Sequence, residues 1–355
     1  MGLRLYLALE FEGGYFGVDG GAYSVGLNEL LGINVNNPGF PRPPLAPGWL
    51  LYPFIEIWGM DTGYKIWSSL ASLSPVVPVV LFARRLRFGP GSAVSSSTAA
   101  WERFPMPPAW AVPFAAGFIL LDLLHAEMFV TGALPLIAFG LLGTAWWAMA
   151  RLCSSHEQLT DRRKAWLSLV LAACIGLIPW VNQTTAGLAV ITLPVYAGGL
   201  LWYNRRGFIT TTQRIAPPMF VGGVIALMAL PWYMDVLPGS GQLDYPGPVV
   251  YFTRWPDPAW SQMGIGVSLG LLMMWKGVEP WLRGLGTLLV LLSTLTVFLS
   301  YDETVINLFF RSRYLMAIPF YIGVTWAVWR FALPWFGKNP RVAKRQEVRD
   351  AYPLF

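Results

Sequence analysis

The feature that most constrains this chain is a series of apolar stretches, each long enough to cross the hydrocarbon core of a membrane. A helix of about 20 apolar residues spans that core. Only 12% of the residues are charged, about half the share of an ordinary soluble protein, so much of the surface is expected to face lipid. The sequence therefore predicts an all-α polytopic membrane protein with nine complete spans at 64–83, 109–124, 128–150, 165–182, 186–203, 215–232, 261–278, 284–300 and 314–335.

The chain opens at Met1 with an apolar run that is too short to span a membrane. We interpret this run as the outer end of a first helix whose upstream part is missing, and the alternative is a short helix lying in the interface. The expected organisation has an outer N-terminal segment and first outer loop with an interfacial helix (1–63), a transmembrane helical bundle (64–335) and a basic cytoplasmic tail (336–355).

Positive charge alternates from one loop to the next, and one alternate set of loops holds most of the 25 Lys and Arg residues. The positive-inside rule makes that set cytoplasmic, together with the C-terminus. We expect a plasma (inner) membrane protein whose active site faces the outside or the periplasm. The net charge of +6 then reflects topology, and nucleic acid is not an expected partner. The outer side keeps six basic residues that need another explanation: Arg4, Arg42, Lys65, Arg254, Arg311 and Arg313.

Two long polar segments on the outer side, 10–63 and 233–260, are where chemistry is expected. In the first segment, Asp19 is followed by glycines that would let a ligand approach closely. A carboxylate held there suits a general base or a cation ligand, although it could equally cap the helix that Ala22 opens. The prolines around Arg42 favour extended backbone and are expected to delay the next helix, an interfacial one, to Trp49.

Several short motifs of the sequence occur in a characteristic order. Asp19 and Tyr23 come first, followed by Arg42-Pro43-Pro44-Leu45, Gly59 and, at the end of a span, Ala83-Arg84-Arg85. Near the last span come Arg311, Arg313 and Tyr314. In these motifs the sequence resembles the GT-C superfamily of integral membrane glycosyltransferases, and above all the bacterial branch related to protein mannosyltransferases and aminoarabinose transferases. It departs from the family where Gly20 replaces a second acid beside Asp19.

The resemblance implies a GT-C-like bundle that moves a sugar from a polyprenyl-phosphate donor to a glycan, lipid or protein acceptor on the outer face, with inversion at the anomeric carbon. Asp19 takes the role of the base that deprotonates the acceptor hydroxyl. Glu127 matches the assisting acid by its position in the next outer loop. The implied substrate-binding residues, among them a guanidinium grip on the donor phosphate, are Tyr23, Arg42, His125, Arg254, Arg311, Arg313 and Tyr314.

The residues themselves leave other interpretations of these positions open. His125 and Glu127 lie in a tight turn between apolar helices, where they are costly unless they are used or hydrated. An arginine at the interface can bind phosphate or simply anchor the helix among lipid headgroups. The two cysteines, Cys153 and Cys174, are expected to be free structural thiols, so no thiolate metal site is predicted. A divalent ion, Mg²⁺ or Mn²⁺, between Asp19 and Glu127 is left open.

Three other classes of protein compete with a glycosyltransferase. A secondary transporter would carry ionisable residues near the middle of the membrane, whereas these spans are nearly free of charge. An O-antigen polymerase or ligase would also act on lipid-linked sugars, with its essential Arg and His in one large late outer loop. A scaffold protein without catalysis is the third class. The gathering of polar residues on one face favours chemistry at the outer interface.

Overall fold

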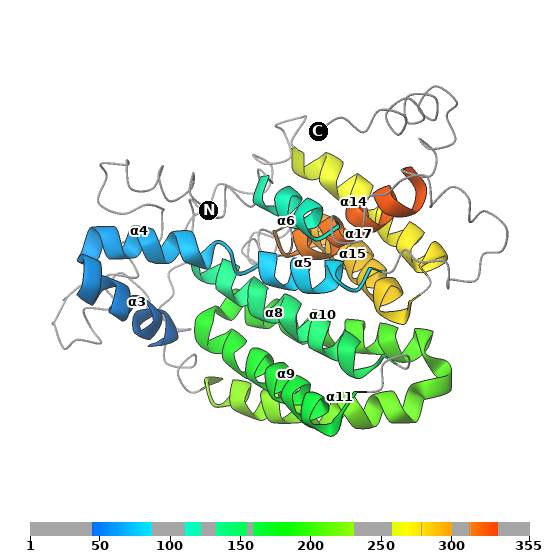
Figure 1. The fold of residues 1–355 in the computed structure, drawn as a ribbon, viewed down its shortest axis with the longest axis horizontal. Helices are drawn as coiled ribbons and strands as arrows, with labels where there is room; N and C mark the ends of the chain where they lie inside the picture. The colour runs from blue at the N-terminus through cyan, green and yellow to red at the C-terminus, as the bar shows by residue number, and fades with distance from the viewer. Residues whose placement is uncertain are drawn as a thin grey trace, which may run out of the picture.

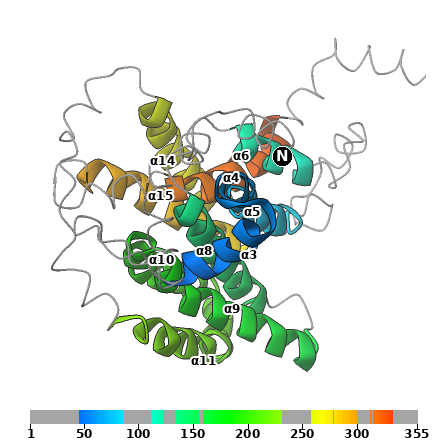
Figure 2. The same ribbon diagram turned by 90° about the vertical axis from the view of Figure 1, so that its left-hand side faces the viewer.

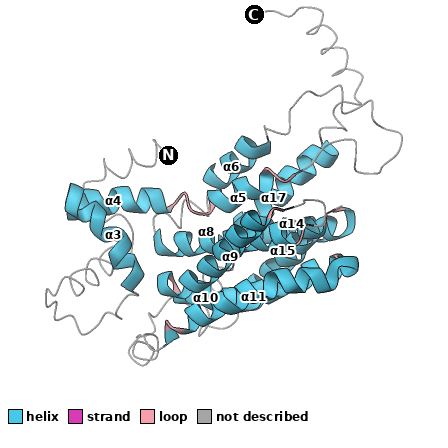
Figure 3. Ribbon diagram, turned by 60° about the horizontal axis from the view of Figure 1, so that its bottom comes forward, coloured by secondary structure: helices cyan, strands magenta, loops and turns pink. Residues whose placement is uncertain are grey.

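The protein is a bundle of helices in all the parts that the structure describes. The computed structural model describes residues 45–86, 111–121, 133–154, 159–230, 258–277, 279–299, 312 and 314–332. Within these ranges there is no strand (Figure 3). The predicted all-α fold class is thereby confirmed. The helices are α3 (Leu45–Trp58), α4 (Met60–Ala71), α5 (Val76–Ala83), α6 (Ala111–Leu121), α8 (Ala133–Leu152), α9 (Asp161–Val181), α10 (Gln183–Tyr203), η3 (Arg205–Gly207), α11 (Phe208–Leu227), α14 (Pro258–Lys276), α15 (Pro280–Leu299), α17 (Ala317–Ala327) and η5 (Val328–Ala332).

Each of the nine predicted spans contains a described helix. Two of the described helices, Gly264–Lys276 and Pro280–Leu295, are shorter apolar segments. The total number of spans therefore stays a prediction. The described helical segments that are long and apolar enough to cross a membrane are Met60–Ala83, which joins α4 and α5, and the single helices Pro135–Leu152, Asp161–Val181 and Gln183–Tyr203.

Prolines and caps decide where several helices begin and end. The first predicted span is built from α4 and α5, which are separated by a turn at residues 72–75. Pro75 ends this turn, because proline cannot donate the backbone hydrogen bond that a continuous helix needs. Asn182 ends α9 and caps α10, where its side chain accepts a hydrogen bond of 2.9 Å from the Thr185 amide. The backbone of Asn182 itself is extended, so α9 and α10 are two separate helices.

One helix begins earlier than the sequence predicts. The prolines around Arg42 were expected to prevent a helix before Trp49, but α3 already begins at Leu45. Pro47 then lies in the first turn of the helix, where an amide has no intrahelical acceptor and proline is tolerated. The expectation was wrong because it treated every proline as a helix breaker regardless of its position.

Neighbouring helices approach closely at glycines. A Cβ at Gly270 in α14 would lie 2.8 Å from the Gly286 carbonyl oxygen of α15, and a Cβ at Gly222 in α11 would lie 2.8 Å from the Ala172 carbonyl oxygen of α9. Such distances leave no room for a side chain. Small residues at these crossings let backbones pack together in lipid, where no hydrophobic force drives helices together.

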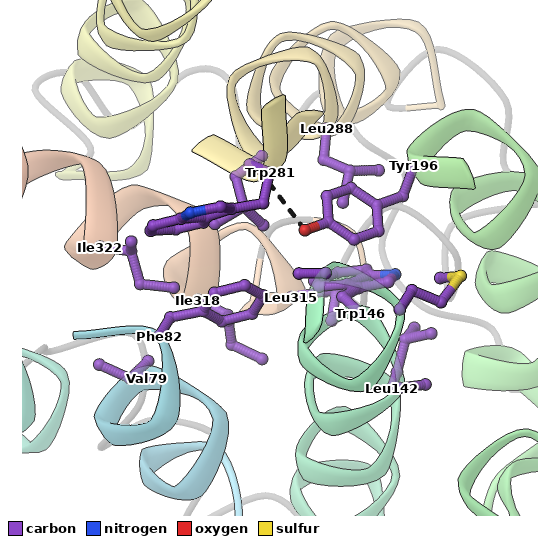
Figure 4. Close-up of a cluster of buried hydrophobic side chains, with 14 of the residues drawn as sticks. Val79, Phe82, Leu142, Trp146, Tyr196, Trp281, Leu288, Leu315, Ile318 and Ile322 are labelled. Atoms are coloured by element: carbon purple, nitrogen blue, oxygen red, sulfur yellow. Dashed lines mark hydrogen bonds between the residues drawn. The ribbon is translucent and has the colours of Figure 1, made fainter. Parts of the chain in front are cut away.

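The centre of the bundle is an aromatic core (Figure 4). Phe82 of α5 stacks on Trp281 of α15 with 5.5 Å between ring centroids. The Tyr196 hydroxyl of α10 donates to the Trp281 carbonyl at 3.5 Å, and Trp146 of α8 lies 6.3 Å from the Tyr196 ring. This core joins the C-terminal parts of α5, α8 and α10 to the start of α15, so those four ends meet at one end of the bundle.

At the other end of the bundle, α3 and α4 form a helical hairpin, which projects beyond the remaining helices (Figure 1). It packs on α8 and α9 through a smaller apolar cluster whose members include Leu51, Tyr64, Ala138 and Val181. Because Ala138 lies early in α8 and Val181 closes α9, the hairpin is at the opposite end from the meeting point near Trp281. Figure 2 shows the bundle from the hairpin side.

Candidate functional site

Most of the side chains that the sequence predicts for the site lie outside the described residues. Tyr314 is described, and it is buried in the main apolar core at the start of the last helical segment. Its proposed contact with substrate is not tested by this position. The predicted residues outside the described ranges are Asp19, Tyr23, Arg42, His125, Glu127, Arg254, Arg311 and Arg313.

The described structure closest in sequence to the Arg42-Pro43-Pro44-Leu45 motif is the α3–α4 hairpin, which begins at Leu45. Its turn is made by Gly59, whose φ of 77° is a backbone conformation that favours glycine. Gly63, one turn into α4, lies directly against the backbone of Phe54, so that any Cβ there would overlap it. These two glycines hold the helix that follows the motif tightly against the start of the first complete span.

A buried ion pair lies just beyond that turn. The Nζ atom of Lys65 is 2.9 Å from Oδ2 of Asp61, one helical turn earlier in α4. The Lys65 side chain is only 5% exposed, whereas the Asp61 side chain is 50% exposed. A lysine ammonium is strongly hydrated, so burying it is costly unless a carboxylate and further polar groups replace the water. The Asp61 carboxylate therefore compensates the positive charge of Lys65 at the beginning of the span.

The polar character of α4 continues for two turns below Lys65. Ser68, Ser69 and Ser72 are all buried, in a segment that is otherwise apolar enough to cross a membrane. The Ser68 and Ser72 hydroxyls donate to the carbonyls of Lys65 and Ser69, at 3.2 and 2.7 Å. The Ser69 hydroxyl has no hydrogen-bond partner among the described residues. We refer to Lys65, Ser68, Ser69 and Ser72 as the α4 polar strip.

The facing helix α3 adds an acid and a phenol to this end of the bundle. A hydrogen bond to the Glu56 carboxylate, together with its negative charge, raises the pKa of the Tyr52 hydroxyl above its ordinary value. Trp49 and Trp58 are largely exposed on the same helix. Exposed tryptophan on a short helix beside the ends of spans is typical of a membrane interface.

The hairpin end therefore combines an exposed carboxylate, a buried ammonium and serine hydroxyls within two neighbouring helices. The Asp61 carboxylate is the part of this arrangement that reaches the surface, while the Lys65 ammonium pairs with it and the Ser68 and Ser72 hydroxyls donate to backbone carbonyls of the same segment. Among the described residues, no group of three His, Cys, Asp or Glu side chains is placed to hold a metal ion. Asp19 and Glu127, for which a metal was left open, lie outside these residues.

The sequence alone did not single out Lys65 as a site residue. It appeared only as one of six outer basic residues that topology does not explain. The signal that could have identified it is the spacing Asp61-x-x-x-Lys65 at the start of an apolar stretch, since residues four apart share one face of a helix. An ionisable residue inside a span marks a functional position by default.

No protein-family model matches this sequence, and no curated protein matches it. Two solved structures share its fold. The crystal structure of ArnT from Cupriavidus metallidurans in the apo state matches with a TM-score of 0.59 at 14% identity, covering 98% of this chain and 60% of ArnT. The structure of the same protein bound to undecaprenyl phosphate matches with a TM-score of 0.56 at 14% identity, covering 98% of this chain and 61% of ArnT.

ArnT is an aminoarabinose transferase of the GT-C superfamily. The GT-C-like fold that the sequence motifs imply is thereby confirmed, and the chain is a membrane-embedded helical protein. The chain spans about 60% of the length of the ArnT structures that it matches.

Proposed function

We propose that this protein is a membrane glycosyltransferase that moves a sugar from a polyprenyl-phosphate donor to an acceptor at the outer face of the membrane. One observation carries the proposal: 98% of the chain follows the fold of ArnT, and one of the ArnT structures holds undecaprenyl phosphate. The motif residues resemble the same superfamily independently of that match, because they were identified in the sequence alone.

In the proposed reaction, Asp19 takes the proton of the acceptor hydroxyl while that oxygen attacks the anomeric carbon of the sugar. A new glycosidic bond forms, the bond from the anomeric carbon to the phosphate oxygen breaks, and polyprenyl phosphate leaves with the bonding electrons. Attack from the face opposite the leaving group inverts the anomeric centre. Glu127 assists as a second carboxylate.

Cations have to hold the donor phosphate and stabilise the charge that it gains on leaving. We assign this role to Arg311 and Arg313, whose guanidinium groups can bind phosphate oxygens bidentately. Arg42 and Arg254 close the site from the outer loops, and Tyr23, His125 and Tyr314 complete the contacts with sugar and acceptor. The described part of the chain contains one further buried cation, Lys65, which pairs with Asp61 in the second helix of the α3–α4 hairpin.

The proposal is tested by binding of a polyprenyl-phosphate sugar to the purified protein in nanodiscs. The parent is compared with Arg313→Ala, Asp19→Asn and, as a charge-matched control at the opposite end of the bundle, Arg162→Ala. We expect Arg313→Ala to lose binding, while Asp19→Asn and Arg162→Ala keep it. Absence of binding by the parent would contradict the proposal and direct the next assay to solute uptake. The same assay with and without EDTA tests whether a divalent ion takes part.

A further inference from the structure

Two tryptophans are exposed at the end of the bundle opposite the hairpin. Trp202, in the last turn of α10, is 64% exposed, and Trp275, in the last turn of α14, is 72% exposed. Both helices end beside the start of α15, where the buried aromatic core also lies. We call this end of the bundle the arginine end, after four half-buried side chains, Arg85, Arg151, Arg214 and Arg283.

A cation lies over each of the two exposed rings. The Cζ atom of Arg205 is 4.1 Å from the centroid of the Trp202 ring, and the Nζ atom of Lys276 is 3.9 Å from the centroid of the Trp275 ring. Both cationic residues are themselves exposed. The face of an indole attracts a cation, and the apolar stem of the cationic side chain covers part of the ring. Each helix end thus combines an amphipathic ring with a solvated charge.

Packing against α15 places the two rings at the same level of the bundle. Gly199 of α10 lies against Gly284, and Gly270 of α14 lies against Gly286, two residues deeper in the antiparallel α15. The tryptophan of α10 follows Gly199 by three residues, and that of α14 follows Gly270 by five. At a rise of about 1.5 Å per residue, both rings therefore stand about 4.5 Å beyond the level of Gly284.

The length of α10 agrees with a membrane boundary at this level. α10 has no charged side chain, and Asn182 caps its other end at the hairpin side of the bundle. From Gln183 to Trp202 the helix rises about 28 Å, close to the roughly 30 Å of the hydrocarbon core. A polar cap at one boundary and a tryptophan at the other are what a single crossing of the membrane requires.

Exposed apolar side chains lie between these two boundaries. Val190 is 75% exposed and lies about 18 Å from Trp202 along α10. Ile265 is 54% exposed and lies about 15 Å from Trp275 along α14. Half of the hydrocarbon core is about 15 Å thick, so both side chains are placed near the middle of the bilayer. The two tryptophans then lie at its edge.

The chemistry of the two pairs favours lipid over a protein partner. Lysine is depleted in the buried centres of protein–protein interfaces, whereas Lys276 covers one of the two rings. An indole has an apolar body and a polar N–H group, and the boundary between hydrocarbon and headgroups accommodates both. A long cationic side chain beside it extends its charge from the same boundary toward water.

We propose that the pairs Trp202–Arg205 and Trp275–Lys276 dock the arginine end into the headgroup layer of a phospholipid membrane. The rings lie at the edge of the hydrocarbon, and the two cations lie among the headgroups. This surface fixes how deeply α10 and α14 are inserted, and it lies at the opposite end of the bundle from the α3–α4 hairpin. The inference depends on the membrane-embedded fold and not on the proposed function.

The test measures the depth of spin labels on the full chain in phosphatidylcholine nanodiscs. Trp202→Cys and Trp275→Cys carry the label at the proposed boundary, while Val190→Cys and Ile265→Cys are the matched deep positions on the same helices. Collision rates with oxygen and with a polar nickel chelate give each depth, and the free label in buffer is the water reference. The two native cysteines are buried, and the parent treated in parallel measures their background labelling.

We expect labels 202 and 190 to differ in depth by about 18 Å, and labels 275 and 265 by about 15 Å. The nickel chelate should reach positions 202 and 275 at rates between those of the deep positions and of water. Arg205→Cys and Lys276→Cys keep the tryptophans and should be more accessible to the chelate, so they carry the same test if a tryptophan variant does not insert. Labels at 202 and 275 that are as deep as those at 190 and 265, that are as accessible as in water, or that are shielded from both reagents by a protein partner would each overturn the proposal.

Discussion

Two Asp–Lys ion pairs of equal length lie at opposite ends of this bundle, and they differ in how far they are buried. Lys65 to Asp61 and Lys164 to Asp161 both measure 2.9 Å between nitrogen and oxygen. The Lys65 side chain is 5% exposed, whereas the Lys164 and Asp161 side chains are 39% and 98% exposed. Water competes for the second pair and not for the lysine of the first. Burial, and not distance, therefore determines which pair matters to the fold.

The same contrast holds for the two ends as a whole. The hairpin end places one ammonium and several hydroxyls inside a span, while the opposite end surrounds its half-buried arginines with exposed charges. A polar group inside a span has to be satisfied by the protein itself. The hairpin end should therefore be sensitive to single substitutions, and the arginine end should tolerate changes on its exposed surface.

The largest effect on stability is expected at Gly63. A Cβ there overlaps the backbone of Phe54, so Gly63→Ala should separate α3 from α4 and destabilise the protein by about 3 kcal/mol. Gly198, in α10 toward the arginine end, has nothing within 4 Å of a Cβ, and Gly198→Ala should be neutral or slightly stabilising. Unfolding in mixed micelles of SDS and detergent measures both. Equal stability of the two variants would contradict the tight hairpin.

Asp61→Asn should have the next largest effect. It leaves the buried Lys65 ammonium without its carboxylate, at a cost of about 1 to 3 kcal/mol, less than for a fully buried pair because Asp61 is half exposed. Asp161→Asn removes the same group from the exposed pair and should leave the unfolding midpoint unchanged. If both substitutions shift the midpoint equally, burial does not distinguish the two pairs.

Replacing both partners of the buried pair sharpens the same comparison. The double variant Asp61→Leu/Lys65→Met should recover stability to within about 1 kcal/mol of the parent, because two apolar side chains need no compensation in this setting. Sugar transfer by this double variant then separates structure from function. A stable protein with reduced transfer would assign the pair to the site, and unchanged transfer would make it purely structural.

The smallest effect concerns thiol chemistry at the arginine end. Both cysteines are free, as the sequence predicts, and both are buried. The pKa of Cys153 is raised to about 12, so less than about one in ten thousand of its thiols is ionised at pH 7.5. Because maleimide reacts with the thiolate, labelling of the folded protein should be very slow. Labelling should accelerate as the pH rises toward 12. Arg214→Gln removes a charge that favours the thiolate, and it should slow labelling further; faster labelling in that folded variant would contradict the arrangement.

Much of the fold could be predicted because a single strong signal determines it. Long apolar stretches separated by basic loops located a helix in all nine expected ranges, and the start at 45 instead of 49 came from a proline tolerated in a first turn. The packing could not be predicted in the same way. Nothing in the sequence around Gly63 or Arg214 shows that one lies against Phe54 and the other reaches Leu152, 62 residues away.

Only part of the candidate site could be predicted from the sequence. Motif residues such as Asp19 and Arg313 stand out because they match a family pattern, although the described structure does not include them. Lys65 has no such pattern, and its importance arises from burial, which depends on tertiary contacts.

The most direct test of the account is sugar transfer by the Asp19→Asn protein. The variant keeps the size of the side chain but removes the base, and it is assayed in proteoliposomes with a polyprenyl-phosphate sugar against the parent and the exposed-charge control Asp161→Asn. The account predicts a rate reduced by about a hundredfold or more in Asp19→Asn, with donor binding intact, and a parent-like rate in the control. Transfer at the parent rate by a correctly inserted Asp19→Asn protein would contradict it.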